Sequence, residues 1–234
     1  SRHFIAMLAQ MLQVPIFAPD YRLTPEHPHP AQLEDGLVAY RHLLGAGADP
    51  KHVVVGGDSA GGHLALMLLA KLRAAGLPQP ALAIGLSPWT DIGRRGESQF
   101  GNDRYDMVQG CQTLQYAAWL KGDTGASDAD LSPIHQSYRD AAPVYLQAGG
   151  KEILVDMIRD FARSLQLQGA RVRLDVWEHM THEFHAYGDT LVQSRQAIAG
   201  IREAMAWATG ADAGTLAVGP QTELDGLRFV GNRI

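Results

Sequence analysis

A glycine-rich turn around Ser59 constrains the fold of this chain more than any other feature. The stretch Gly57-Asp58-Ser59-Ala60-Gly61 follows the β-branched run 53–55 and precedes the apolar segment 60–75. A buried strand that turns sharply into a helix needs glycines, because backbone segments approach closely there. The turn places the Ser59 hydroxyl beside a helix N-terminus, where negative charge is favoured. The pattern predicts a nucleophilic serine, with the backbone N–H of Ala60 aimed at an oxyanion; a turn that merely joins strand to helix is the alternative.

Short apolar runs alternate along the chain with segments of helical apolar spacing. We expect strands at 14–18, 53–55, 81–86, 144–148 and 171–177, and helices at 3–12, 31–44, 60–75 and 153–168. This alternation predicts an α/β fold with a mostly parallel sheet that helices cover on both faces. Residues 93–143 interrupt it and are too long for an ordinary connection, so we expect a helical insertion over the end of the sheet. The tail from 209 to 234 is left unassigned.

A nucleophilic serine needs a base to take its proton. His179, His182 and His185 follow the expected strand 171–177, and His182 is the favoured base. Because these histidines are three residues apart, they do not match the His-Glu-x-x-His spacing of a zinc site, and we expect no metal.

The base needs an acid that orients it, and that acid should follow the strand 144–148. Glu152 comes first after this strand, while Asp156 and Asp160 fall on the following helix. Charge at a helix N-terminus or on a solvated helix face is the alternative for the two aspartates. Glu152 is therefore the first candidate for the acid.

The composition excludes several classes of partner. The net charge of −5 argues against a nucleic-acid binder, which would carry a clustered basic surface. The longest apolar run, 64–70, is too short to span a bilayer. The single cysteine, Cys111, rules out an intrachain disulfide and fits a cytoplasmic location. We expect no cofactor.

Four motifs, in the same order, resemble those of the hormone-sensitive-lipase-like family of α/β-hydrolases, also called bacterial family IV esterases. They are Asp20-Tyr-Arg-Leu-Thr-Pro-Glu-His-Pro28, the turn at 57–62, Ser87-Pro-Trp-Thr-Asp91 and His182-Glu-Phe184. The resemblance covers residues 1 to about 208. It implies an α/β-hydrolase core at 1–92 and 144–208, a cap insertion at 93–143 and a tail at 209–234.

The resemblance also implies roles for single residues. Ser59 matches the nucleophile and His182 the base. The family's acid is usually an aspartate in an Asp-Pro-Leu-x-Asp segment, and the matching stretch here begins with Glu152 and ends with Asp156. Glu152 thus takes the place of the acid, and Asp156 is the fallback.

The implied activity is a carboxylesterase that hydrolyses short-chain esters through an acyl-enzyme. The expected partner is a small-molecule ester, with a homodimer as the expected assembly. Four residues are expected to line the acyl pocket, with packing inside the cap as the alternative for each: Trp89, Tyr105, Met107 and Trp119.

One departure from the family concerns the oxyanion hole. The family carries a His-Gly-Gly-Gly motif just before the segment that corresponds to 3–12, and this sequence has none. We expect residues that carry this motif, the first strands and part of the cap to precede Ser1. A truncated or inactive esterase homologue and a non-catalytic ligand receptor of the same fold are the alternatives.

Overall fold

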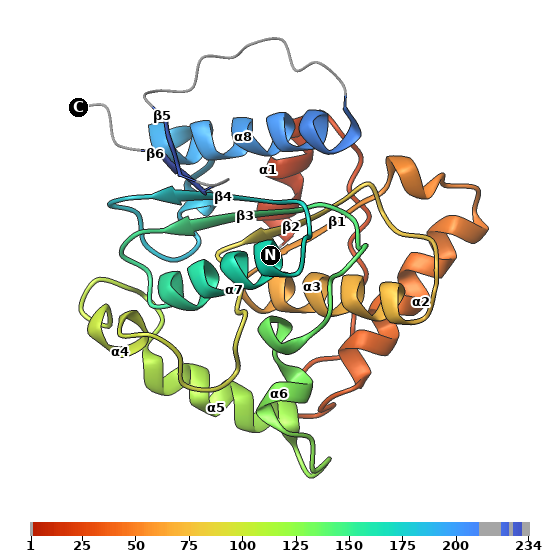
Figure 1. Cartoon of the computed structure of the whole chain (residues 1–234), viewed down its shortest axis with the longest axis horizontal. Coiled ribbons are helices and arrows are strands. Elements are labelled where there is room, and N and C mark those ends of the chain that lie inside the picture. The colour runs from red at the N-terminus through yellow and green to blue at the C-terminus, as the bar shows by residue number, and fades with distance from the viewer. Residues whose placement is uncertain (1, 211–220, 225–226, 231–234) are drawn as a thin grey trace.

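A single sheet organises the chain, as the computed structural model shows (Figure 1). The structure describes residues 2–210, 221–224 and 227–230. The strand order is β1-β2-β3-β4-β6-β5, parallel except for the antiparallel pair β5 and β6. The strands are β1 Val54–Asp58, β2 Leu82–Leu86, β3 Val144–Gly149, β4 Val172–Trp177, β5 Gln221–Leu224 and β6 Leu227–Val230.

Helices cover both faces of this sheet (Figure 1). One face carries α1 and α8, and the other carries α3 and α7, with α2 packed outside α3. Three further helices, α4 to α6, lie between β2 and β3 along the chain. The helices are α1 Arg2–Leu12, α2 Ala31–Gly45, α3 Ser59–Ala74, α4 Ser98–Gly101, α5 Gly110–Lys121, α6 Asp128–Leu131, α7 Val155–Leu167 and α8 Val192–Thr209, with 3₁₀ turns at Pro50–His52, Pro133–His135 and Phe184–Thr190.

Strand periodicity divides the core into two layers. Successive side chains of a strand point to opposite faces, and β3 shows this directly. Val144 and Leu146 pack into the cluster under α3 and α7, whereas Tyr145 packs into the cluster under α1 and α8. On α7, the buried Ile158, Phe161 and Leu165 recur at helical spacing and face the sheet. The expected α/β-hydrolase architecture, a mostly parallel sheet flanked by helices, is confirmed.

One sequence-based expectation is wrong, and part of the segment without an assignment can be described. The segment 14–18 is irregular rather than a strand, and Phe17 is 52% exposed. Pro15 contributes to this because it has no N–H to donate to a strand ladder. The tail, left unassigned above, contributes β5 and β6, which extend the sheet beyond β4.

The insertion expected at 93–143 contains α4, α5 and α6. The helical character expected for this insertion is carried mainly by α5. The division of the chain into a core and a cap stays a prediction. Within the described residues, no helix has both the length and the apolar character needed to cross a bilayer.

Candidate active site

Ser59 sits at a sharp turn between β1 and α3. Its backbone φ is 49°, the left-handed region that a non-glycine residue rarely adopts. Glycines make room for this turn. A Cβ at Gly57 would collide with the backbone of Gly61, and one at Gly62 would come within 2.8 Å of Pro88. The turn therefore exposes Ser59 at the carboxyl end of the strand, as a nucleophile elbow requires.

His182 reaches Ser59 from the loop that follows β4. Its Nε2 lies 2.9 Å from the Ser59 Oγ, within hydrogen-bond distance. The imidazole is almost completely buried. This geometry allows Nε2 to take the hydroxyl proton as Oγ attacks.

Glu152 lies on the other side of His182, just after β3, and is fully buried. Its Oε2 accepts hydrogen bonds from the Ser87 Oγ (2.6 Å) and the Gly149 N–H (2.7 Å). Its Oε1 faces the His182 Nδ1 at 3.8 Å, an ion-pair contact longer than a hydrogen bond. Neither of these two atoms has a hydrogen bond within the part of the chain that the structure describes. The carboxylate is thus fixed by one oxygen and directed at the imidazole by the other.

The other acidic candidates are engaged elsewhere. Asp156 accepts the Ser98 N–H at 2.9 Å and pairs with Arg159 at 3.7 Å. Asp160 pairs with Arg95 at 3.4 Å. Both lie on α7, and the groups that they contact are these rather than the imidazole, so the geometry favours Glu152 as the acid.

The two neighbouring histidines also differ from His182. His179 is exposed, and His185 is buried against Phe184. Burial lowers the pKa of His185 to about 3, so its ring is neutral. Neither ring makes a described hydrogen bond to Ser59.

Three carboxylates act on the charge of His182. Burial by itself disfavours the imidazolium, but Glu152, then Glu183 and Asp106, outweigh it and raise the pKa of His182 above its usual value. Carboxylates placed in this way stabilise the charged form of the imidazole. The site is therefore arranged for general-base chemistry.

A cavity of about 360 Å³ opens beside Ser59 and His182. It is mainly apolar, and side chains from α2, α3 and α5 and from the segment after β2 surround it. Its lining includes Leu33, Leu64, Met67, Trp89, Val108, Thr113, Tyr116, Trp119 and Leu120. A small acyl or alcohol group fits such a volume.

The structure brings two of the four residues expected in the acyl pocket to this cavity, and their role in binding stays a prediction. Trp89 and Trp119 line the cavity, whereas Tyr105 and Met107 lie outside its described lining. Tyr105 is 43% exposed and packs against the cation of Lys151, and Met107 is 65% exposed. Both belong to the irregular loop between α4 and α5, from which Val108 rather than either of them reaches the cavity.

His63 forms part of the cavity wall. Its Nε2 lies 2.7 Å from the Leu131 carbonyl oxygen, and its ring packs on Trp89. Because a carbonyl only accepts, Nε2 carries the proton. Burial lowers the pKa of His63 to about 4, so this wall is uncharged at neutral pH.

Sequence reasoning did not single out three residues that shape the site. The Ser87 hydroxyl donates a hydrogen bond to the Glu152 carboxylate. Asp106 accepts the backbone N–H of His182 at 3.2 Å. The Glu183 carboxylate lies 3.8 Å from the His182 Nε2. Ser87 and Glu183 lie in two of the four motifs that resemble those of the family, at 87–91 and 182–184, so the sequence contained a signal for them. Asp106 lies in the insertion, where no motif marks it.

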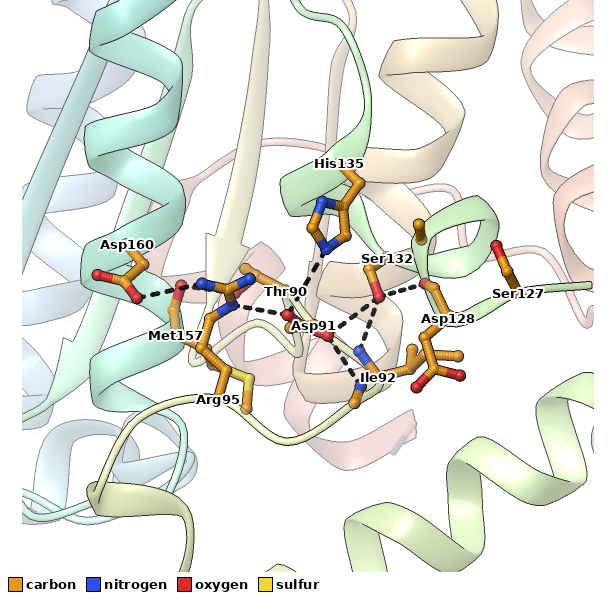
Figure 2. A network of polar contacts seen from close by, with 12 residues as sticks. Thr90, Asp91, Ile92, Arg95, Ser127, Asp128, Ser132, His135, Met157 and Asp160 are labelled. Carbon is orange, nitrogen blue, oxygen red and sulfur yellow. Dashed lines mark hydrogen bonds and ion pairs between the residues drawn. The ribbon is translucent and has the colours of Figure 1, made fainter.

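A second polar cluster lies after β2 (Figure 2). The buried Asp91 accepts from the Gly93 N–H (2.8 Å), the Ser132 Oγ (3.2 Å) and the Arg95 Nε (2.6 Å). Arg95 also pairs with Asp160 on α7. This cluster ties the segment after β2 to α7 and to the end of the insertion. Across the described residues, no three His, Cys, Asp or Glu side chains gather as metal ligands would.

The chain is similar in sequence to known hydrolases. A sequence model described as "alpha/beta hydrolase fold" matches residues 1–186. An acetyl-hydrolase of Streptomyces hygroscopicus is 35% identical over 199 residues, which are 84% of this chain and 66% of that protein. An esterase of Acinetobacter venetianus is 30% identical, over 86% of this chain and 67% of that protein. The chain thus spans about two thirds of the length of these curated relatives.

Solved structures agree with the sequence matches. The crystal structure of an esterase from the bacterial hormone-sensitive lipase family superposes with a TM-score of 0.84 at 35% identity, over 89% of this chain and 71% of that one. The structure of EstE5 soaked with p-nitrophenyl butyrate gives 0.83 at 34% identity, over 89% and 70%. The fold and the serine turn thus define an α/β-hydrolase. Within that class, the chain belongs to the hormone-sensitive lipase family.

Proposed function

We propose that this chain hydrolyses carboxylic esters with short acyl chains through an acyl-enzyme. The observation that carries the proposal is the 2.9 Å contact between the Ser59 Oγ and the His182 Nε2 at a mainly apolar cavity. Glu152, buried behind the imidazole, completes a Ser–His–acid arrangement.

The proposed reaction has two steps. His182 takes the Ser59 proton as Oγ attacks the ester carbonyl, and it then protonates the leaving alcohol. Glu152 keeps the Nδ1–H tautomer and stabilises the imidazolium. The Ala60 N–H, at the start of α3, donates to the oxyanion. Water, activated by His182, then releases the acid from Ser59.

The proposed preference for short chains rests on the cavity. About 360 Å³ lies near the lower end of the range for small-molecule sites, and the aromatic rings of Trp89 and Trp119 line it. The name acetyl-hydrolase of a relative is consistent with a small acyl group. We expect kcat/KM to fall as the acyl chain lengthens beyond what this volume holds.

The test is hydrolysis of p-nitrophenyl esters from acetate to laurate, together with labelling by a fluorophosphonate, which reacts with activated serines. Ser59→Ala should abolish both, while Ser164→Ala on α7 should leave both unchanged. Hydrolysis that survives Ser59→Ala would exclude the serine mechanism. A folded wild type that neither hydrolyses esters nor becomes labelled would favour an inactive homologue or a ligand receptor.

Two further expectations stay predictions. The homodimer is checked by sedimentation of the purified chain, and the cytoplasmic location by cell fractionation.

A further inference from the structure

Asp106 is a buried carboxylate between α4 and α5 that reaches both loops of the proposed triad. Its Oδ2 accepts the backbone N–H of Ile153 at 2.7 Å, next to Glu152. Its Oδ1 accepts the backbone N–H of His182 at 3.2 Å. One side chain from the insertion is therefore bonded to the backbone of His182 and to the backbone of the residue after Glu152.

The chemistry of this contact requires a carboxylate. Oδ1 also accepts the Met107 N–H at 2.8 Å, so two oxygens serve three N–H donors. An ionised Asp is acceptor-only, whereas an amide replaces one oxygen by an NH₂ group that cannot accept. In Asp106→Asn, either the Ile153 or the His182 N–H would lose its acceptor, and a buried unpaired donor is costly.

The segment 102–109, which carries Asp106, also forms part of the cavity lining. Asn102 donates to the Glu152 carbonyl oxygen at 3.0 Å, and Val108 lines the cavity. Gln109, the N-cap of α5, donates to the Asp106 carbonyl oxygen at 3.2 Å. One continuous stretch thus contacts the substrate space and holds the acid loop.

We infer that Asp106 is a positioning residue, which fixes the loops of Glu152 and His182 relative to each other so that the imidazole stays between acid and nucleophile. The inference rests on the proposed hydrolase function. The two loops also bond directly, from the Lys151 N–H to the Met180 carbonyl oxygen at 2.9 Å. Asp106 adds hydrogen bonds to the backbone of Ile153, next to Glu152, and of His182 itself.

The charge of Asp106 gives a readout that a purely structural role would not move. The charged groups that act on the His182 ring are Glu152, Glu183 and Asp106. Behind them lie Asp58, which interacts with Glu183, and His185, which is neutral. Because Asp106 helps to raise the pKa of His182, its loss should move the acidic limb of the kcat/KM profile to lower pH.

The test compares Asp106→Asn with Asp103→Asn in the whole chain. Asp103 accepts the Gly110 N–H at 2.7 Å and makes no described contact with either loop, so it controls for damage to the insertion. We expect kcat of Asp106→Asn on p-nitrophenyl butyrate to fall between about 10-fold and 100-fold, with KM changed less than about 3-fold, because misplacement by an ångström costs about this much. Fluorophosphonate labelling of Ser59 should slow in parallel. Asp103→Asn should keep the wild-type kcat and pH profile.

A wild-type kcat and pH profile in folded Asp106→Asn would overturn the inference, and so would an equal loss in both variants. If Asp106→Asn does not fold, Asp106→Glu and Asp103→Glu take their place, since each lengthens a side chain by one methylene. Asp106→Glu should then lose kcat while Asp103→Glu does not, and equal kcat in the two would overturn the inference. A wild type without hydrolysis or labelling would instead refute the proposed function.

Discussion

Two buried carboxylates follow neighbouring strands of the sheet and differ in what surrounds them. Asp91 follows β2, and both of its oxygens accept hydrogen bonds, one from the permanent cation of Arg95. Glu152 follows β3, and one of its oxygens faces only the titratable His182, at 3.8 Å. A carboxylate with a permanent partner and filled hydrogen bonds holds structure. A carboxylate with an unfilled oxygen and a titratable partner is available for chemistry.

The largest effect should come from Glu152→Gln. The neutral amide does not stabilise the imidazolium or enforce the tautomer, so kcat should fall by about 10³- to 10⁴-fold, as for an orienting acid in other triads. Steady-state kinetics on p-nitrophenyl butyrate measures this. Asp156→Asn is the matched control, because Asp156 bonds to Ser98 rather than to His182. If only Asp156→Asn lost activity, the assignment of the acid would be wrong.

Asp91→Asn should act on stability instead. Removing one partner of a buried pair typically costs about 3–5 kcal/mol. Arg95 is partly exposed and keeps Asp160, so we expect about 2–3 kcal/mol here. Urea denaturation measures the loss, and kcat per folded molecule should stay near the wild-type value. A large fall in kcat without a loss of stability would make Asp91 part of the chemistry and erase the contrast with Glu152.

Glu183→Gln should shift a pH profile. Glu183 helps to raise the pKa of His182, and His182 must be neutral to act as a base. Its removal should therefore move the acidic limb of kcat/KM to lower pH. Glu178→Gln, an exposed residue of the same loop, should leave the limb in place. A shift of this limb to higher pH would show that Glu183 does not raise the pKa of His182.

The same pKa has a consequence for stability. Because the pKa of His182 is raised in the folded state, its protonated form stabilises the fold. This contribution is complete below the unfolded pKa, about 6.5, and disappears as the pH rises through the raised value. Glu183→Gln should reduce it.

The smallest effect should come from Asp160→Asn. Asp160 contacts the same Arg95 as Asp91 does, but its side chain is 38% exposed. Exposed ion pairs contribute at most about 1 kcal/mol and often much less, so we expect about 0.5 kcal/mol in urea denaturation. Equal losses in Asp160→Asn and Asp91→Asn would show that burial does not set the strength of this cluster.

Structure that depends on local backbone geometry could be predicted from the sequence motifs. The turn at Ser59 needs its glycines, so strand, turn and helix were predictable. The structure brings Glu152 and His182 to Ser59 as the strand order implies, and their catalytic roles stay predictions. The outward orientation of Tyr105 and Met107 was not predictable, because tertiary contacts decide which side of a loop faces a cavity. The role inferred for Asp106 depends on backbone donors far along the chain, which leave no local pattern.

The hydrogen bond from His63 to the Leu131 carbonyl gives the site a spectroscopic marker. Its Nε2–H is buried and its ring stays neutral well below pH 6, so its proton resonance should persist across the working range of the enzyme. His185 is neutral as well. Of these two rings and His182, the His182 ring should gain its charge at the highest pH, because the carboxylates around it raise its pKa. Its imidazole signal, assigned by its loss in His182→Ala, would then report the protonation state of the proposed base directly, without a substrate.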